Sequence, residues 1–194
     1  MRRRSSATSS WRSAASAAAA AWLTLATLPL DAQTSGRISP NTTAKSFTAA
    51  ARYLTVTARV IPNAIAPGGR LFLEADIKPK PGIHVYAPGS QYRAVTIKLA
   101  ANSPFRLEGP LEYPKPVLYT FKPLNEQVMV YDGPFRLAAQ IGLDRGRAVV
   151  TPLGSSGIPL VASLDYQACD DRVCYLPESV PLRWPVTILP SPRP

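Results

Sequence analysis

The fold is decided by two stretches, YLTVTARVI at residues 53–61 and RLFLEADIK at residues 70–78. In both, apolar and polar side chains alternate with period two, which is typical of a strand that buries one face. The residues APGG at 66–69 separate the two stretches and are typical of a turn, because proline and glycine favour tight backbone reversals. The two stretches therefore predict two strands joined by a turn.

The same alternation continues along the chain and is interrupted by proline- and glycine-rich turns. Further strands are expected at residues 94–100, 126–131, 135–143, 146–150, 158–169 and 180–189. The 21 prolines argue against long helices, because a proline inside a helix removes a hydrogen bond and clashes with the preceding turn. Seven to nine short antiparallel strands predict an all-β protein with an immunoglobulin-like antiparallel β-sandwich.

The beginning of the chain has the composition of an export signal. Four arginines within residues 1–12 precede the apolar run AASAAAAAWLTLATLPL at residues 14–30. This run has about 17 residues, fewer than the ~20 needed to span a bilayer, so we interpret residues 1–32 as a secretory signal peptide. An uncleaved membrane anchor is the alternative. We expect the mature protein to be exported or periplasmic, soluble and without a membrane span, with a flexible leader at 33–51 and one domain at 52–190.

Charge and motifs exclude several function classes. Without residues 1–32, 18 basic and 11 acidic residues remain, a net charge of +7. The basic residues are scattered singly, whereas nucleic-acid binding needs a clustered basic stripe, so no nucleic-acid partner is expected. A hydrolase is poorly supported, since the chain has one histidine, no Gly-x-Ser-x-Gly motif and no recognisable pair of catalytic carboxylates.

The two cysteines of the chain lie close together in YQACDDRVCYLP, residues 166–177. On a helix, residues five positions apart diverge by roughly 140° and cannot form a disulfide. On two antiparallel strands joined by the loop DDRV, Cys169 and Cys174 face each other at about 4.5–5.5 Å between Cα atoms, which a disulfide tolerates. The spacing is therefore useful only on a β-hairpin.

Three chemical roles stay open for this pair. A structural disulfide across six residues stabilises a fold by only about 2 kcal/mol, which a domain of this size does not need. A redox role is equally compatible, because a strained cross-strand disulfide is easily reduced. A metal site is less favoured, because the two cysteines and His84 supply at most three ligands where structural zinc takes four, so we expect no metal and no cofactor.

The segment DYQACDDRVCYLPESVPLRW resembles the end of the N-terminal periplasmic domain of the thiol:disulfide interchange protein DsbD. In that family a Tyr-Gln-x-Cys strand and a Cys-Tyr-x-Pro strand flank the redox cysteines. PGIHVYAPG and VMVYDGPFRL resemble the family in order and spacing, so the likeness covers roughly residues 53–190. The best-known members have five residues between the cysteines where this chain has four, so the shape of the family's loop is not carried over.

The resemblance implies an immunoglobulin-like domain that relays reducing equivalents by disulfide exchange. Cys174 corresponds to the cysteine that forms a mixed disulfide with the partner, and Cys169 to the cysteine that resolves it. The implied electron donor is a thioredoxin-like protein. Since the sequence contains no Cys-x-x-Cys motif, we expect this donor to be a separate protein. The implied acceptors are exported disulfide oxidoreductases, such as disulfide isomerases, or cytochrome c maturation factors.

The resemblance also implies a cap, a loop whose aromatic side chain shields the cysteines until a partner docks. The corresponding stretch is PVLYTFKPLNEQ, where Phe121 is the first candidate and Tyr119 the second. The family's aromatic strand near the site corresponds to HVY, which predicts that His84 and Tyr86 lie close to the cysteines. Ordinary packing at an edge of the sandwich is the alternative for these side chains.

The loop between the cysteines carries opposing charges. Asp170 and Asp171 are expected to raise the pKa of the thiols through like charge, and Arg172 is expected to lower it.

The competing hypothesis for the whole chain is a non-catalytic β-sandwich interaction module with a structural hairpin disulfide.

Overall fold

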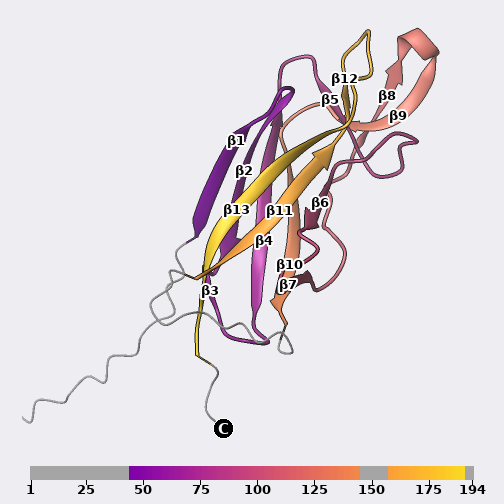
Figure 1. Cartoon of the computed structure of the whole chain (residues 1–194). Coiled ribbons are helices and arrows are strands. Elements are labelled where there is room, and N and C mark those ends of the chain that lie inside the picture. Colours follow the sequence, from indigo (N-terminus) through magenta and orange to yellow (C-terminus); the bar gives the residue numbers. More distant parts are fainter. Residues whose placement is uncertain (1–43, 145–156, 191–194) are drawn as a thin grey trace, which may run out of the picture. The chain divides into compact units, whose positions relative to one another are not determined.

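A computed structural model describes residues 44–144 and 157–190 of this protein (Figure 1). Within these residues thirteen strands and one 3₁₀ helix occur, and no α-helix. The elements are β1 Lys45–Ala50, β2 Leu54–Ile61, β3 Ala64–Ile65, β4 Arg70–Pro79, β5 His84–Tyr86, β6 Thr96–Leu99, β7 Phe105–Leu107, β8 Val117–Phe121, η1 Lys122–Leu124, β9 Glu126–Tyr131, β10 Phe135–Leu143, β11 Ile158–Tyr166, β12 Ala168–Cys169 and β13 Glu178–Ile188. The predicted all-β, immunoglobulin-like sandwich is confirmed.

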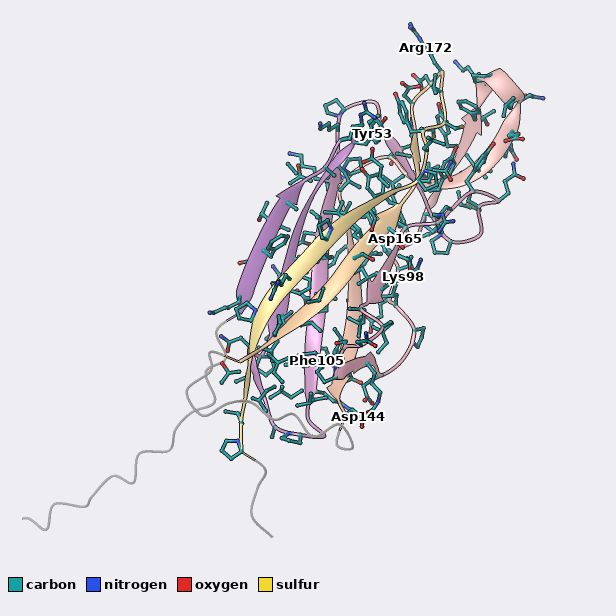
Figure 2. All side chains as sticks on the ribbon, in the orientation of Figure 1. Tyr53, Lys98, Phe105, Asp144, Asp165 and Arg172 are labelled. Carbon is teal, nitrogen blue, oxygen red and sulfur yellow. The ribbon has the colours of Figure 1, made fainter. Side chains whose placement is uncertain are left out.

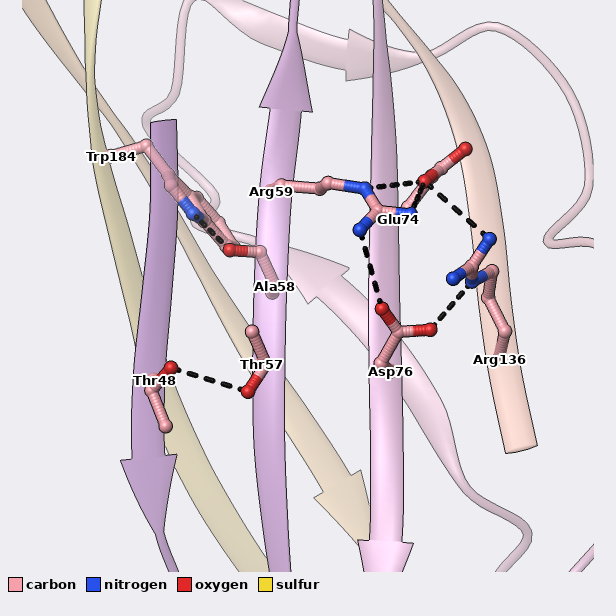
Figure 3. Close-up of polar contacts among 8 residues, drawn as sticks. All are labelled: Thr48, Thr57, Ala58, Arg59, Glu74, Asp76, Arg136 and Trp184. Carbon is pink, nitrogen blue, oxygen red and sulfur yellow. Dashed lines mark hydrogen bonds and ion pairs between the residues drawn. The ribbon is translucent and has the colours of Figure 1, made fainter. Parts of the chain in front are cut away.

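The first layer is a five-stranded antiparallel sheet in the order β1-β2-β4-β10-β7. Alternate side chains of its central strands are buried, as the period of two predicts: in β2 every second residue from Leu54 to Val60 is at most 1% exposed. The outer face carries charged side chains, although Phe72 of β4 is also exposed there. Arg59 and Arg136 pair there with Glu74 and Asp76 across three neighbouring strands (Figure 3).

The second layer is a four-stranded sheet in the order β3-β13-β11-β6. β11 and β13 pair antiparallel along their length, and the two-residue strand β3 pairs parallel with β13, which is an exception to the predicted antiparallel pattern. Trp184 of β13 is 1% exposed, and its indole N–H donates to the carbonyl of Ala58 in the first layer at 3.1 Å (Figure 3). This bond satisfies the one polar atom of the buried indole.

The third sheet, in the order β12-β5-β9-β8, lies with the loop after β12 at one end of the two layers (Figure 1). In β5 and β12 neighbouring residues point to opposite sides, and both sides are buried. Val85 and Ala168 pack into the main core, whereas Tyr86 and Cys169 belong to a second, smaller cluster. The chain enters β5 through a turn in which Gly82 has φ +75°, a conformation that favours glycine.

The structure corrects the proposed leader. Residues 45–50 were assigned to a flexible leader at 33–51, but they form β1, which pairs antiparallel with β2. The small and polar side chains of this strand hid the pattern, because only Phe47 presents a large apolar group; its ring meets Trp184 edge-on at 6.2 Å. The signal peptide at 1–32 and the strand expected at 146–150 lie outside the described residues.

The described ranges contain no helix long and apolar enough to cross a membrane.

Candidate functional site

The two cysteines face each other across a β-hairpin. Cys169 and Cys174 form an antiparallel bridge, flanked by the backbone hydrogen bonds from Asp170 to Val173 (3.0 Å) and from Tyr175 to Ala168 (2.9 Å). These bonds make the cysteines a non-hydrogen-bonded pair, for which Cα atoms lie about 4.5 Å apart. That separation is within disulfide range, and both side chains are free thiols in the structure. The predicted hairpin geometry is confirmed.

The carboxylate of Asp170 closes the turn between the cysteines. One of its oxygens accepts the backbone N–H groups of Arg172 and Val173 at 2.8 and 2.7 Å, and the other accepts the hydroxyl of Tyr175 at 2.6 Å. These hydrogen bonds, above all the one from Tyr175, lower the pKa of Asp170. The Tyr175 ring also stacks on Tyr53 at 4.1 Å, which anchors the hairpin to the main body of the sandwich.

The cysteines lie on the face of the third sheet that points away from the main core. Tyr86, Val128, Val130 and Cys169 form a small buried cluster on this face. Tyr92, Tyr119 and Cys174 pack against it and are partly buried. We call these seven residues the cysteine cluster. The register explains the grouping, because side chains paired across neighbouring strands share a face.

The two thiols have unequal environments. Cys169 is fully buried, whereas Cys174 is partly exposed. Burial raises the pKa of the Cys169 thiol to about 11, opposed by a hydrogen bond from Tyr86. Smaller contributions that raise this pKa come from Cys174, Asp170 and Asp171. The predicted effect of the two aspartates is confirmed in direction for Cys169, but burial is the larger cause and the sequence could not show it.

Tyr86 brings a hydroxyl group to the sulfurs. Its oxygen lies 3.1 Å from the sulfur of Cys174, and the side chain is fully buried. Burial, followed by hydrogen bonding to Cys174 and Cys169, holds the pKa of this phenol far above its ordinary value. The hydroxyl is therefore protonated at physiological pH and available as a donor.

Tyr119 reaches across to the cysteine hairpin from β8. Its ring stacks on His84 with centroids 4.0 Å apart, and its hydroxyl donates to Asp171 in the loop at 2.6 Å. That hydrogen bond raises the pKa of Tyr119 to about 12. His84 is paired in register with Cys169, and its buried Nδ1 has no hydrogen-bond partner among the described residues. Both residues therefore lie next to the cysteine hairpin.

Phe121 lies at the end of β8, immediately before η1, and is 3% exposed. It belongs to the same arm as Tyr119 but is not a member of the cysteine cluster. The stretch interpreted as a cap loop is a hairpin, formed by β8, η1 and β9. Of the two cap candidates, Tyr119 is the one that contacts the cysteine hairpin directly.

Two features of the site were missed in the sequence. Tyr92 stacks on Tyr86 with ring centroids 4.4 Å apart, and its hydroxyl donates to Glu126 at 2.7 Å. Tyr92 follows a turn and Glu126 begins a strand, 34 residues later, so no local pattern links them. The role of Tyr175 was also missed, although its position next to Cys174 was a signal.

The chemistry available here is that of a dithiol. In the described residues no three His, Cys, Asp or Glu side chains come together as a possible metal site. What the site offers instead is a partly exposed cysteine, a buried cysteine opposite it, and a buried hydroxyl 3.1 Å from the sulfur of the partly exposed one. A thiolate at the accessible position can attack a disulfide, and the opposed sulfur can resolve the mixed species.

Comparison with known proteins agrees with this chemistry. The family described as "Thiol:disulfide interchange protein DsbD, N-terminal" matches residues 50–181. Among curated proteins, no relative matches the sequence.

Solved structures also match this chain. The N-terminal periplasmic domain of ScsB from Proteus mirabilis is 15% identical, with a TM-score of 0.51; the match covers 74% of this chain and 51% of that one, so this chain spans about half its length. The DsbD N-terminal domain of Neisseria meningitidis, in the reduced form, is 18% identical, with a TM-score of 0.41 and coverage of 59% and 77%.

Proposed function

Because this chain belongs to the family of DsbD N-terminal domains, the domains of a thiol:disulfide interchange protein, we propose that it relays reducing equivalents through Cys169 and Cys174. The observation that carries the proposal is the unequal environment of the two opposed thiols. Cys174 is partly exposed and beside a hydroxyl donor, whereas Cys169 is buried with a raised pKa. A relay needs two unequal sulfurs, since one must attack the partner's disulfide and the other must stay unreacted until it resolves the mixed disulfide.

The exchange proceeds in two steps that conserve atoms and electrons. The Cys174 thiolate attacks one sulfur of the partner's disulfide; the new S–S bond forms as the partner's bond breaks, and the leaving sulfur keeps the electron pair. Cys169 then loses its proton and attacks Cys174, which releases the partner's second thiolate. Two electrons pass to the partner, the two thiol protons end on its sulfurs, and a Cys169–Cys174 disulfide remains.

The partners that fit this exchange carry an exposed cysteine pair. A thioredoxin-like donor in a separate protein reduces the Cys169–Cys174 disulfide, and exported disulfide oxidoreductases or cytochrome c maturation factors accept the electrons. The periplasm is the compartment we propose, on the basis of the basic and apolar composition of residues 1–32. The protein acts there as an electron carrier, a thiol:disulfide oxidoreductase without a cofactor.

The arm formed by β8, η1 and β9 acts as the cap. Its contact with the hairpin, the hydrogen bond from Tyr119 to Asp171 together with the stacking on His84, supports this role. Phe121 closes the end of the same arm. The cap keeps the dithiol from small oxidants until a partner displaces Tyr119.

Single cysteine variants test the relay. Cys169→Ser should accumulate a mixed disulfide with an exported thioredoxin-fold protein, because no second thiol remains to release it. Cys174→Ser should accumulate none. Non-reducing gels of periplasmic extracts, followed by mass spectrometry of the adducts, give the readout. Equal adducts from both variants would refute the assigned roles.

The second candidate function is a non-catalytic interaction module with a structural disulfide. The closely tied turn favours it, because the two backbone hydrogen bonds to Asp170 give the hairpin an ordered conformation of the kind that a structural element needs. The reduction potential of the pair distinguishes the two functions, since structural disulfides usually lie below about −300 mV. A potential below that range, together with no adduct from Cys169→Ser, would favour the module.

A further inference from the structure

The hydroxyl of Tyr86 differs from the other tyrosine hydroxyls around the hairpin. Those of Tyr92, Tyr119 and Tyr175 each donate to a carboxylate at 2.6–2.7 Å. The Tyr86 oxygen instead lies 3.1 Å from the sulfur of Cys174. A thiol is a weak donor and a thiolate has no proton at all, so the phenol is the donor whenever Cys174 is ionised.

The position of this hydroxyl is fixed on all sides. Tyr86 is fully buried and its ring stacks on Tyr92 with an interplanar angle of 19°. The Tyr92 ring is in turn held by its hydrogen bond to Glu126. On the other side of the same strand, Val85 is buried in the main core. A donor held in this way loses little freedom when it bonds to a charge, which is the condition for effective electrostatic stabilisation.

We propose that Tyr86 is a catalytic residue of the exchange: its hydroxyl donates a hydrogen bond to the sulfur of Cys174 and stabilises the thiolate that attacks the partner's disulfide. The proposal rests on the proposed function and adds a group that stabilises the attacking sulfur. The proton stays on the phenol throughout. The hydrogen bond is strongest while Cys174 carries the negative charge and weakens when its sulfur is bonded in a disulfide.

The asymmetry of the pair follows from this donor together with burial. Burial raises the pKa of Cys169 to about 11, and the effect of the Tyr86 hydroxyl there is too small to offset it. Cys174 combines the same donor with partial exposure. The sulfur that receives this hydrogen bond and is also partly exposed is therefore the one that we assign as the attacking group.

The variant Tyr86→Phe removes the hydroxyl and keeps the ring. Reduced wild-type and variant proteins are treated with iodoacetamide across a range of pH, and modification of Cys174 is followed by peptide mass, separately from Cys169. A hydrogen bond to a charged group corresponds to at least about a tenfold change in an equilibrium, so the thiolate fraction at pH 7 should fall about tenfold. The less stabilised thiolate is a better nucleophile by about threefold, because nucleophilicity rises with roughly half the change in basicity.

The two effects predict a crossing of the rate profiles. At pH 7 the variant should react about threefold more slowly than wild type, and on the alkaline plateau about threefold faster. A general loosening of the site would instead make the variant faster at every pH. A blocked site would make it slower at every pH. Either of these results, or unchanged profiles, would overturn the proposal.

Tyr166→Phe is the matched control. Tyr166 is also fully buried, but it is part of the main core and its hydroxyl donates to Glu178 at 2.7 Å. This control should leave the Cys174 profile unchanged, and the same crossing in it would refute a specific role of Tyr86. Should Tyr86→Phe fail to fold, 3-fluorotyrosine placed at position 86 keeps the shape and donates more strongly, so alkylation at pH 7 should become faster; no increase would again refute the proposal.

The outcome is separable from that of the relay itself. A crossing profile without adducts from Cys169→Ser means that Tyr86 activates the thiol but that the chain is not a relay. Adducts without a crossing mean that the relay operates and that Tyr86 is not catalytic.

Discussion

Replacing Tyr119 should make the cysteine pair more reactive toward small disulfides. Tyr119→Phe removes the hydroxyl that donates to Asp171 at 2.6 Å and keeps the ring that stacks on His84 at 4.0 Å. Tyr119→Ala removes both contacts. If the arm of β8 and β9 must lift before the sulfurs react, each lost contact increases the fraction of molecules in which the arm is open.

The expected size follows from the two contacts. A hydrogen bond of this kind near the surface contributes about 1 kcal/mol to stability, so Tyr119→Phe should increase the open fraction about fivefold. An aromatic pair contributes about 0.5–1.5 kcal/mol more, so Tyr119→Ala should lose roughly 2 kcal/mol in total, corresponding to about thirtyfold. The second-order rate constant of the reduced protein should rise by these factors, provided that the closed form is unreactive.

The assay is the reaction of reduced protein with a small aromatic disulfide, followed by stopped-flow absorbance of the released thiolate. Tyr175→Phe is the matched control, because it removes a tyrosine–aspartate hydrogen bond of the same length in the same hairpin, while its ring stacks on Tyr53. The control rate should change by less than about twofold. Rates unchanged in both Tyr119 variants would refute Tyr119 as the cap.

Phe121→Ala tests the first cap candidate in the same assay. A faster reaction there, without an effect of Tyr119, would place the cap at the end of β8. No increase in any of the three variants would mean that the arm does not shield the pair.

Three further predictions concern stability. Replacing both Cys169 and Cys174 by serine should leave the fold intact and cost about 2 kcal/mol relative to the disulfide form, because a six-residue ring constrains little of the unfolded chain; thermal unfolding measures it, and failure to fold would favour the structural module. The pKa of Cys169 is raised in the folded state, so its contribution to the free energy of unfolding of the reduced protein is complete below about pH 9 and should be lost as the pH rises toward about 11. The variant Cys169→Ala should show no such loss of stability. The pKa of Asp170 is lowered in the folded state, so its contribution to the free energy of unfolding is present above about pH 4 and should disappear as the pH falls below that value. In urea titrations, Asp170→Ala should cost about 1 kcal/mol at pH 7 and nothing at pH 2. An equal cost at both pH values would refute the idea that the ionised carboxylate stabilises the turn.

The strand pattern was predictable because each long strand buries one face. Residues 135–143 form β10 as expected. Residues 158–169, predicted as one strand, form two strands, β11 and β12, which belong to different sheets. Short elements with little apolar alternation were missed. β1 has one large apolar side chain, and β8 lies in a stretch with a proline at each end, so neither gave a clear period of two.

The parts of the site that lie within one short segment were predictable from the sequence, and the contacts between residues far apart in the sequence were not. The hairpin follows from the spacing of Cys169 and Cys174 and from the turn residues between them. The hydrogen bond from Tyr86 to Cys174 joins residues 88 positions apart, and the bond from Tyr119 to Asp171 joins residues 52 apart. Such contacts depend on how strands that are distant in sequence come together in the third sheet, and no pattern within one segment predicts that arrangement.

The alternation of side chains within the third sheet connects the stability of the fold to the chemistry of the cysteines. Val85 and Ala168 hold β5 and β12 to the main core, and their neighbours Tyr86 and Cys169 are thereby held on the opposite face. The hydroxyl and the buried sulfur are therefore positioned by packing that takes no part in the exchange. Cys174 follows the turn and is partly exposed, so it is the cysteine of the pair that a partner can meet without disturbing the core. A donor and a resolving sulfur held in place by packing, next to a partly exposed attacking sulfur, suit a reversible thiol exchange, because the attacking sulfur must bond alternately to a partner and to Cys169.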